Sequence, residues 1–155
     1  MKNIHESISG LNSLKNLPLN GSFTTIPDRV FQLGNIEEIN LKSQYLSSIP
    51  DKDFELNSLK RLSIKGSFSK IPKSISKLNT LTNLSLEGSF NGIPESMSEM
   101  VNLKELTLYS PNLTELPKSI TAHQYCRFYF LNNTLNSNKK LIRKIKKNGG
   151  MVNEW

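Results

Sequence analysis

Three columns of aliphatic residues recur along the chain at an almost constant interval. Within each column the steps are 22, 23, 22 and 22 residues, and all fifteen positions are Leu or Ile. The columns are Leu14, Ile36, Leu59, Leu81 and Leu103; Leu17, Ile39, Leu62, Leu84 and Leu106; and Leu19, Leu41, Ile64, Leu86 and Leu108. Self-similarity at this interval predicts an array of stacked structural repeats.

A proline follows the aliphatic columns in every unit and always comes directly after Ile or Leu. The prolines are Pro27, Pro50, Pro72, Pro94 and Pro117. Apolar residues two positions apart have strand spacing, with both side chains on one face. Proline cannot lie in a central strand, and the apolar residues beyond it are three apart, which favours a short helical or 3₁₀ return. Such a unit is too thin to bury its apolar edge alone, so the units must stack.

The repeated Leu-x-x-Leu-x-Leu segment resembles the leucine-rich-repeat family over residues 11–120, and the Ile/Leu-Pro pair with the 22–23-residue interval resembles its typical longer subclass. The resemblance implies an α/β fold, a right-handed solenoid with a parallel β-sheet on the concave face and a helical, 3₁₀ or irregular convex side. It also implies a single domain over residues 1–155 that binds a protein partner and is not an enzyme.

Both ends depart from the regular unit. Residues 1–13 align with the second half of a unit, with His5 in the place of proline, and we expect a half repeat that either caps the array or contacts a partner, a second copy or further repeats. Residues 14–123 hold about five units.

Residues 124–155 are predicted to form a last strand and a basic helix. Cys126, Tyr129 and Leu131 continue the three columns at steps of 23. Residues 139–147 have one apolar side, which predicts a helix that caps the last unit. We expect 151–152 and Trp155 to add to this cap.

Composition restricts the chemistry of the chain. Cys126 is the single cysteine, so neither an intramolecular disulfide nor a cysteine-based zinc site can form. No secretory signal pattern follows Met1, and we expect a cytoplasmic location. His5 and His123 lie more than a hundred positions apart, and no phosphate-binding loop, zinc-binding or nucleophile-elbow motif occurs. We therefore expect no enzyme, cofactor or metal, a packed structural role for His123, and a core position for Cys126.

Side chains that alternate with the aliphatic columns define the predicted concave face. The middle column is small and polar, so a partner could approach the sheet closely, and aromatic and Arg residues are common interface anchors. Two interpretations stay open for the aromatic pair at 128 and 130: either it anchors a partner, or the C-terminal helix or tail covers it. The candidate partner-binding residues are Glu38, Asn40, Lys60, Arg61, Lys65, Asn83, Glu87, Lys104, Glu105, Tyr109, Phe128 and Phe130.

Two functions are compatible with these features. The leading hypothesis is a protein-binding module, either a monomer or a dimer joined edge to edge through the N-terminal repeat. The alternative is binding of nucleic acid or an anionic surface through the basic helix, whose charges otherwise form only a solvated face. No apolar stretch is long enough to cross a membrane. The basic residues, which carry much of the net charge of +7, are Lys139, Lys140, Arg143, Lys144, Lys146 and Lys147.

Overall fold

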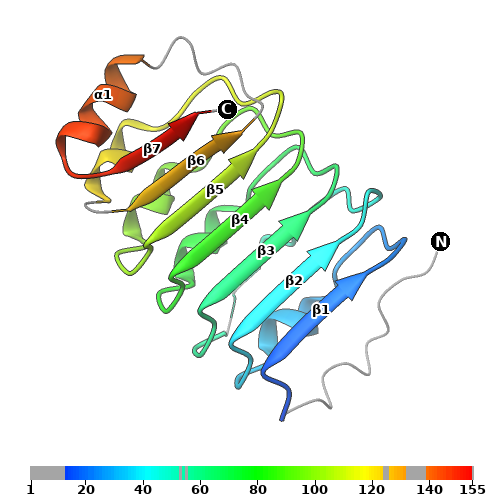
Figure 1. Cartoon of the computed structure of the whole chain (residues 1–155). Helices are drawn as coiled ribbons and strands as arrows, with labels where there is room; N and C mark the ends of the chain where they lie inside the picture. Colours follow the sequence, from blue (N-terminus) through cyan, green and yellow to red (C-terminus); the bar gives the residue numbers. More distant parts are fainter. Residues whose placement is uncertain (1–12, 53, 55, 124–125, 132–138, 155) are drawn as a thin grey trace.

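The computed structural model describes residues 13–52, 54, 56–123, 126–131 and 139–154. Its strands form one parallel sheet in which each strand pairs with the next along the chain (Figure 1). This order is that of a solenoid, because every coil adds one strand beside the previous one. The strands are β1 (Asn16–Asn20), β2 (Glu38–Lys42), β3 (Arg61–Lys65), β4 (Asn83–Glu87), β5 (Glu105–Tyr109), β6 (Arg127–Leu131) and β7 (Met151–Glu154).

The aliphatic columns of the sequence lie in single file across the sheet. Leu17 pairs with Ile39, Ile39 with Leu62, Leu62 with Leu84 and Leu84 with Leu106. All five side chains are buried, with at most 5% of their surface exposed. Each well-buried aliphatic side chain contributes about 1.5–3 kcal/mol to folding. The predicted stack of repeats is therefore confirmed.

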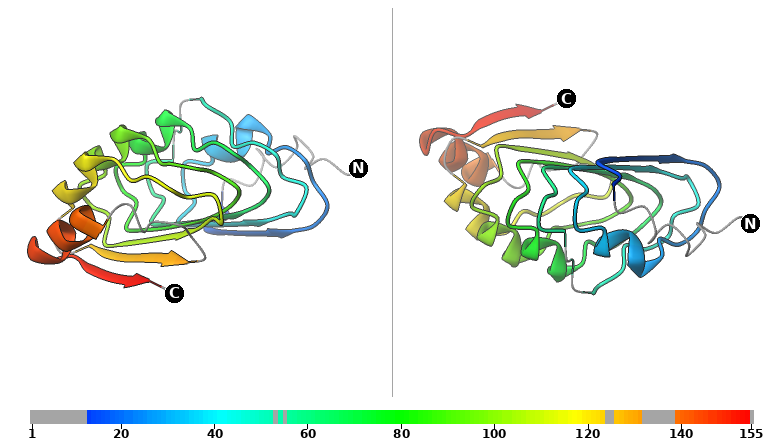
Figure 2. Two further views of the ribbon diagram at one scale, coloured as in Figure 1. Left: turned by 90° about the horizontal axis from the view of Figure 1, so that it is seen from above. Right: turned by 90° about the horizontal axis from the view of Figure 1, so that it is seen from below.

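Short 3₁₀ helices form the side of the solenoid opposite the sheet (Figure 2). Each begins directly after a recurring proline, which is the N-cap residue and cannot continue a strand because it has no N–H group. The proline carbonyl then accepts a hydrogen bond from the residue three positions later, as from Val30 to Pro27 at 3.0 Å. The predicted return segments are thus confirmed in four units, as η2 (Asp28–Gln32), η3 (Lys73–Lys77), η4 (Glu95–Glu99) and η5 (Lys118–Ala122). In the unit after Pro50, the described residues form no 3₁₀ helix.

Glycines in two of the turns after the strands lie against the preceding coil. A Cβ atom on Gly66 would come within 2.6 Å of the carbonyl oxygen of Leu46, and one on Gly88 within 2.8 Å of the carbonyl oxygen of Phe68. The same carbonyls accept backbone hydrogen bonds from the residue after each glycine, at 2.8 and 2.9 Å. Glycine is required here by close approach of two backbones.

Serine replaces glycine in the two turns that are one residue longer. Ser43 and Ser110 are buried, and their hydroxyls donate hydrogen bonds to the carbonyl oxygens of Phe23 at 2.5 Å and Phe90 at 2.6 Å. In the shorter turns, the carbonyl of the preceding coil accepts a hydrogen bond from a backbone N–H group. In the longer turns, the corresponding carbonyl accepts its hydrogen bond from the serine hydroxyl.

The last repeat strand has a different register from the one predicted. In β6, Phe128 pairs with Leu106 and Phe130 with Leu108, so the step is 22 residues rather than 23. Both phenylalanines are fully buried. Their predicted place on the partner-binding face is wrong, and they are core residues of the last repeat.

Tyr129 has the opposite orientation to the phenylalanines and is partly exposed. The predicted core positions Tyr129 and Leu131 pair with Thr107 and Tyr109, which belong to the polar columns of β5. A shift of one residue moves every side chain of a strand to the other face. Burial of two phenylalanines removes more apolar surface from water than burial of a tyrosine and a leucine, and it leaves Arg127 exposed. Cys126 is buried, as expected.

The predicted basic helix is confirmed as α1 (Lys139–Lys147), which covers the C-terminal end of the solenoid (Figure 1). Ile142 and Ile145 on its apolar side are buried. The helix is followed by Gly149, which has a φ of 88°. The N–H of Gly150 donates to the carbonyl oxygen of Ile145 at 3.0 Å, the geometry of a glycine-terminated helix. The following residues form β7, a strand that the sequence analysis did not predict.

Several predictions concern residues outside the described part of the chain. These are the N-terminal half repeat, His5, the N-terminal dimer edge and Trp155. Where the chain is described, no helix has the length and apolar character needed to cross a membrane.

Candidate partner-binding face

The side of the sheet that points away from the core is polar along its length, and we call it the sheet face. Its side chains alternate with the buried columns and are partly or fully exposed. They come from the first, third and fifth positions of the strands. The sheet face comprises Asn16, Pro18, Asn20, Glu38, Asn40, Lys42, Arg61, Ser63, Lys65, Asn83, Ser85, Glu87, Glu105, Thr107, Tyr109, Arg127 and Tyr129.

Small side chains occupy the middle of this face. Ser63, Ser85 and Thr107 lie side by side on adjacent strands and line a shallow hollow of about 220 Å³ together with charged residues of the first column. The neighbouring Asn40 has a buried Oδ1 atom for which no hydrogen-bond partner occurs among the described residues. An extended segment of another molecule could therefore approach the sheet closely at Ser63, Ser85 and Thr107.

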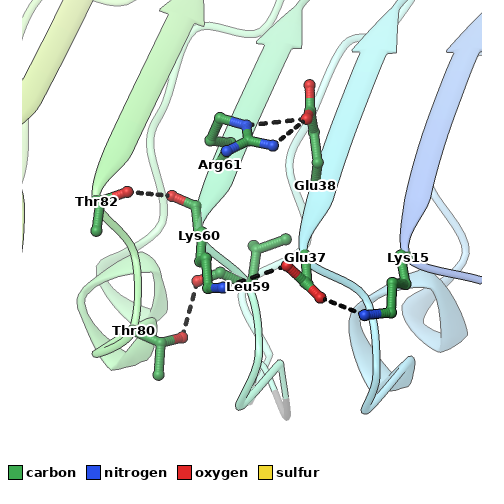
Figure 3. Close-up of polar contacts among 8 residues, drawn as sticks. All are labelled: Lys15, Glu37, Glu38, Leu59, Lys60, Arg61, Thr80 and Thr82. Atoms are coloured by element: carbon green, nitrogen blue, oxygen red, sulfur yellow. Dashed lines mark hydrogen bonds and ion pairs between the residues drawn. The ribbon is translucent and has the colours of Figure 1, made fainter.

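Ion pairs connect the coils in the N-terminal half of the molecule. Glu37, just before β2, accepts hydrogen bonds from the ammonium groups of Lys15 at 2.9 Å and Lys60 at 3.2 Å (Figure 3). These bonds hold the pKa of Glu37 below its usual value. On the sheet face, Arg61 places two nitrogens 2.8 and 2.9 Å from one carboxylate oxygen of Glu38. Exposed pairs of this kind add little stability, but they neutralise these charges within the protein.

A further ion pair lies at the other end of the strands. The ammonium group of Lys65 is 2.7 Å from a carboxylate oxygen of Glu87 on the adjacent strand. The hydrogen bond to Glu87 is the main reason that the pKa of Lys65 is raised. Both residues line an open hollow of about 540 Å³ at the carboxyl ends of β1 to β4, which includes Asn20 and Lys42.

The C-terminal half of the sheet face carries charges that have no ion-pair partner among the described residues. They are Lys104 directly before β5, Glu105 at its first position, and Arg127 on β6. Tyr109, at the end of β5, has 36% of its surface exposed, and Tyr129 is partly exposed. Aromatic rings and unneutralised charges therefore lie together on β5 and β6.

The structure places ten of the twelve predicted face residues on the sheet face or at its edge, and only Phe128 and Phe130 are excluded. Lys60 and Lys104 lie at the edge, directly before their strands. Sequence reasoning missed Arg127 and Tyr129 because it used the wrong register for β6. The sequence Arg-Phe-Tyr-Phe contained a signal for the correct register. A charge is costly to bury, so Arg127 should face solvent, and the phenylalanines that alternate with it should face the core.

Of the residues considered for chemistry, the two that the structure describes, His123 and Cys126, are buried. The Nε2–H group of His123 donates to the carbonyl oxygen of Met97 at 2.8 Å, and burial lowers the pKa of His123. Burial, with a smaller effect from the charge of Glu105, raises the pKa of Cys126 to about 12. A neutral histidine and a protonated thiol fit structural roles. In the described ranges no three His, Cys, Asp or Glu side chains gather in a way that could hold a metal ion.

The basic residues form a separate surface. All six basic side chains of α1 are exposed. The helix contacts η5 and β7, so it covers the end of the solenoid and lies outside the sheet face (Figure 2).

A solenoid of paired parallel strands with a continuous polar face defines a repeat protein of the leucine-rich type. Residues 2–128 match the BspA-type leucine-rich-repeat region in six copies, and the chain belongs to this family. The family and its fold are typically non-enzymatic and suggest a module for protein–protein interaction. The match does not test the narrower assignment to the typical 22–23-residue subclass, which stays a prediction.

A solved structure agrees with this assignment of the fold. A leucine-rich-repeat protein of Leptospira interrogans is similar with a TM-score of 0.55 and 23% sequence identity, over 98% of this chain and 52% of that one. The chain thus spans about half the length of that protein, and the similarity concerns the fold alone. Comparison with curated proteins gave no match.

Proposed function

We propose that this chain is a non-enzymatic module that binds a protein partner on its sheet face. The observation that carries the proposal is the continuous polar face across β1 to β6, which has small residues in the middle of β3 to β5 and larger charged or aromatic residues around them. This arrangement suits a polypeptide, because its backbone can approach the small residues while its side chains meet the larger ones.

The C-terminal half of the face is the proposed centre of binding. In the N-terminal half, a partner's charged groups would compete with the existing ion pairs of Arg61 and Lys65. A partner's charged groups could pair with Lys104, Glu105 and Arg127 without displacing an existing ion pair. Tyr109 adds an exposed aromatic ring of the type that commonly anchors interfaces.

A comparison of two double variants tests the proposal. R61A/Y109A removes an arginine and a tyrosine from the sheet face, whereas R29A/Y45A removes the same residue types from η2 and from a turn, where both are exposed. Tagged wild type and variants are used for affinity capture with quantitative mass spectrometry, after circular dichroism has verified their folding. We expect a partner whose recovery falls at least about tenfold with the first variant and stays unchanged with the second.

Two results would contradict the proposal. Equal recovery with both folded variants would remove the sheet face as the binding surface. A photo-crosslinker at position 45 that captures the partner, when one at position 109 does not, would place binding on the turns instead.

We also propose a cytoplasmic location, and either a monomer or a dimer joined through the N-terminal repeat. The free thiol of Cys126 supports a reducing compartment. Cell fractionation tests the location, and light scattering after size exclusion tests the oligomeric state. Recovery in a secreted fraction, or a trimer or larger assembly, would contradict these expectations.

A further inference from the structure

The net positive charge of the chain is confined to its C-terminal part. Residues 1–126 contain thirteen basic and twelve acidic residues, so this part is almost neutral. Residues 127–153 contain seven basic residues and no acidic one. Six of the seven lie in α1, which is only nine residues long.

The basic residues of α1 occupy one continuous side of the helix. At 100° per residue, they cover an arc of about 160° on the helical wheel. Leu141, Ile142 and Ile145 occupy the opposite side, where both isoleucines are buried, Ile145 belongs to the hydrophobic core and Leu141 packs against it. The side-chain amide of Asn148 also donates to the carbonyl oxygen of Thr121 in η5 at 3.2 Å. The helix is thus held rigidly, with its charged side toward solvent.

This charge pattern opposes helix formation. Lys139 and Arg143, Lys140 and Lys144, and Arg143 and Lys147 are like charges at i and i+4, where they repel each other. The first turn has two lysines and no acidic residue, although the positive end of the helix dipole lies there. Packing of the apolar side accounts for Ile142 and Ile145 but does not require these lysines. A bound polyanion would relieve the repulsion.

We propose that the exposed basic side of α1 binds the phosphate backbone of double-stranded nucleic acid. Nine helical residues extend about 13 Å, so six cations give about one charge per 2 Å. A nucleic acid duplex carries about one negative charge per 1.7 Å of its axis, and a single strand only half as many. The charge density of the helix therefore matches a duplex better. This surface is separate from the sheet face, so the inference does not depend on the proposed function.

The contacts of α1 argue against a membrane as the main partner. A helix that lies in a bilayer surface inserts an apolar side into the lipid. In α1 that side is already used, since Ile142 and Ile145 are at most 5% exposed. Only the charged groups of α1 remain for binding. They suit a water-soluble polyanion, which offers no lipid interior for an apolar side to enter.

Fluorescence anisotropy with a labelled duplex of about 20 base pairs tests this proposal over a range of salt concentrations. The test variant K139Q/K140Q/K144Q/K147Q removes four charges from α1. The control variant K52Q/K70Q/K73Q/K77Q removes four exposed lysines outside α1 and outside the sheet face and lowers the net charge equally. A third variant, in which the same four lysines of α1 are replaced by arginine, keeps the charge.

We expect wild-type affinity to fall with salt at a logarithmic slope of about −3, which corresponds to about three phosphate contacts. The test variant should bind at least about tenfold more weakly, with a slope closer to zero by about 2. The control and arginine variants should stay within about threefold of wild type.

Three outcomes would overturn the proposal. The first is no duplex binding at about 50 mM salt, where phosphate contacts are strong. The second is an equal loss with the test and control variants, because binding would then follow net charge alone. The third is binding to vesicles that contain phosphatidylserine without binding to the duplex. Melting temperatures of all variants establish that each is folded.

Discussion

Alanine substitution at glycine should have opposite effects in turns that have the same sequence. The triplet Gly-Ser-Phe occurs at 21–23, 66–68 and 88–90. Among described glycines, positive φ occurs at Gly149 and at none of these three, so alanine brings no backbone strain in any of the turns. A Cβ on Gly88 would lie 2.8 Å from the Phe68 carbonyl oxygen, whereas one on Gly21 would meet only the Phe23 ring at 3.8 Å.

The magnitudes follow from two opposing effects. Alanine restricts the unfolded chain and stabilises the protein by about 0.4–1 kcal/mol where the native backbone permits it. Overpacking of a tight site costs about 1–3 kcal/mol. For Gly21→Ala only the first effect applies, and stability should rise by about 0.5 kcal/mol. For Gly88→Ala the second effect dominates, because the contacted atom is backbone, and stability should fall by about 1–2 kcal/mol.

Urea denaturation followed by circular dichroism measures this difference. A gap of about 2 kcal/mol between the two variants corresponds to a midpoint difference of about 1 M. Hydrogen exchange gives a local reading, since the Ser89 amide donates to the displaced Phe68 carbonyl at 2.9 Å and should exchange faster in Gly88→Ala. Equal midpoints for the two variants, or a more stable Gly88→Ala, would refute the close-approach argument.

Three further predictions concern the last repeat. Phe128→Ala should destabilise the protein by about 3–5 kcal/mol, because Phe128 is fully buried, whereas Tyr129→Ala should have a much smaller effect; reversed effects in urea denaturation would contradict the register of β6. The pKa of His123 is lowered in the folded state, so its contribution to stability should be fully present above the usual value of 6.5 and should decrease as pH falls below it. If the melting temperature of the wild type falls with pH no more steeply than that of His123→Leu, this prediction is contradicted. Cys126 should resist thiol reagents in the folded protein and react on unfolding, since its pKa is about 12, and fast labelling of the native protein would contradict its burial.

Much of the fold was predictable from particular residues. The columns through Leu17 and Leu19 located β1 to β5, and prolines such as Pro27 located the start of the 3₁₀ returns. Both signals are local, because strand spacing and proline geometry act within a few residues. The predicted face was correct through Tyr109 and wrong from Phe128 onward. Beyond β5 the aliphatic pattern ends, and two registers one residue apart were both compatible with an apolar strand.

The amino-acid sequence by itself determined that the chain stacks coils of 22 or 23 residues, which side of each strand is polar in the first five repeats, and where the basic helix lies. These properties depend on the order of residues within one coil. The tertiary structure alone decided the register of β6, the added strand β7, the pairing of Glu37 with both Lys15 and Lys60, and the difference between Gly21 and Gly88. Each of these depends on atoms of the neighbouring coil, whose distance is set by packing and not by the local sequence.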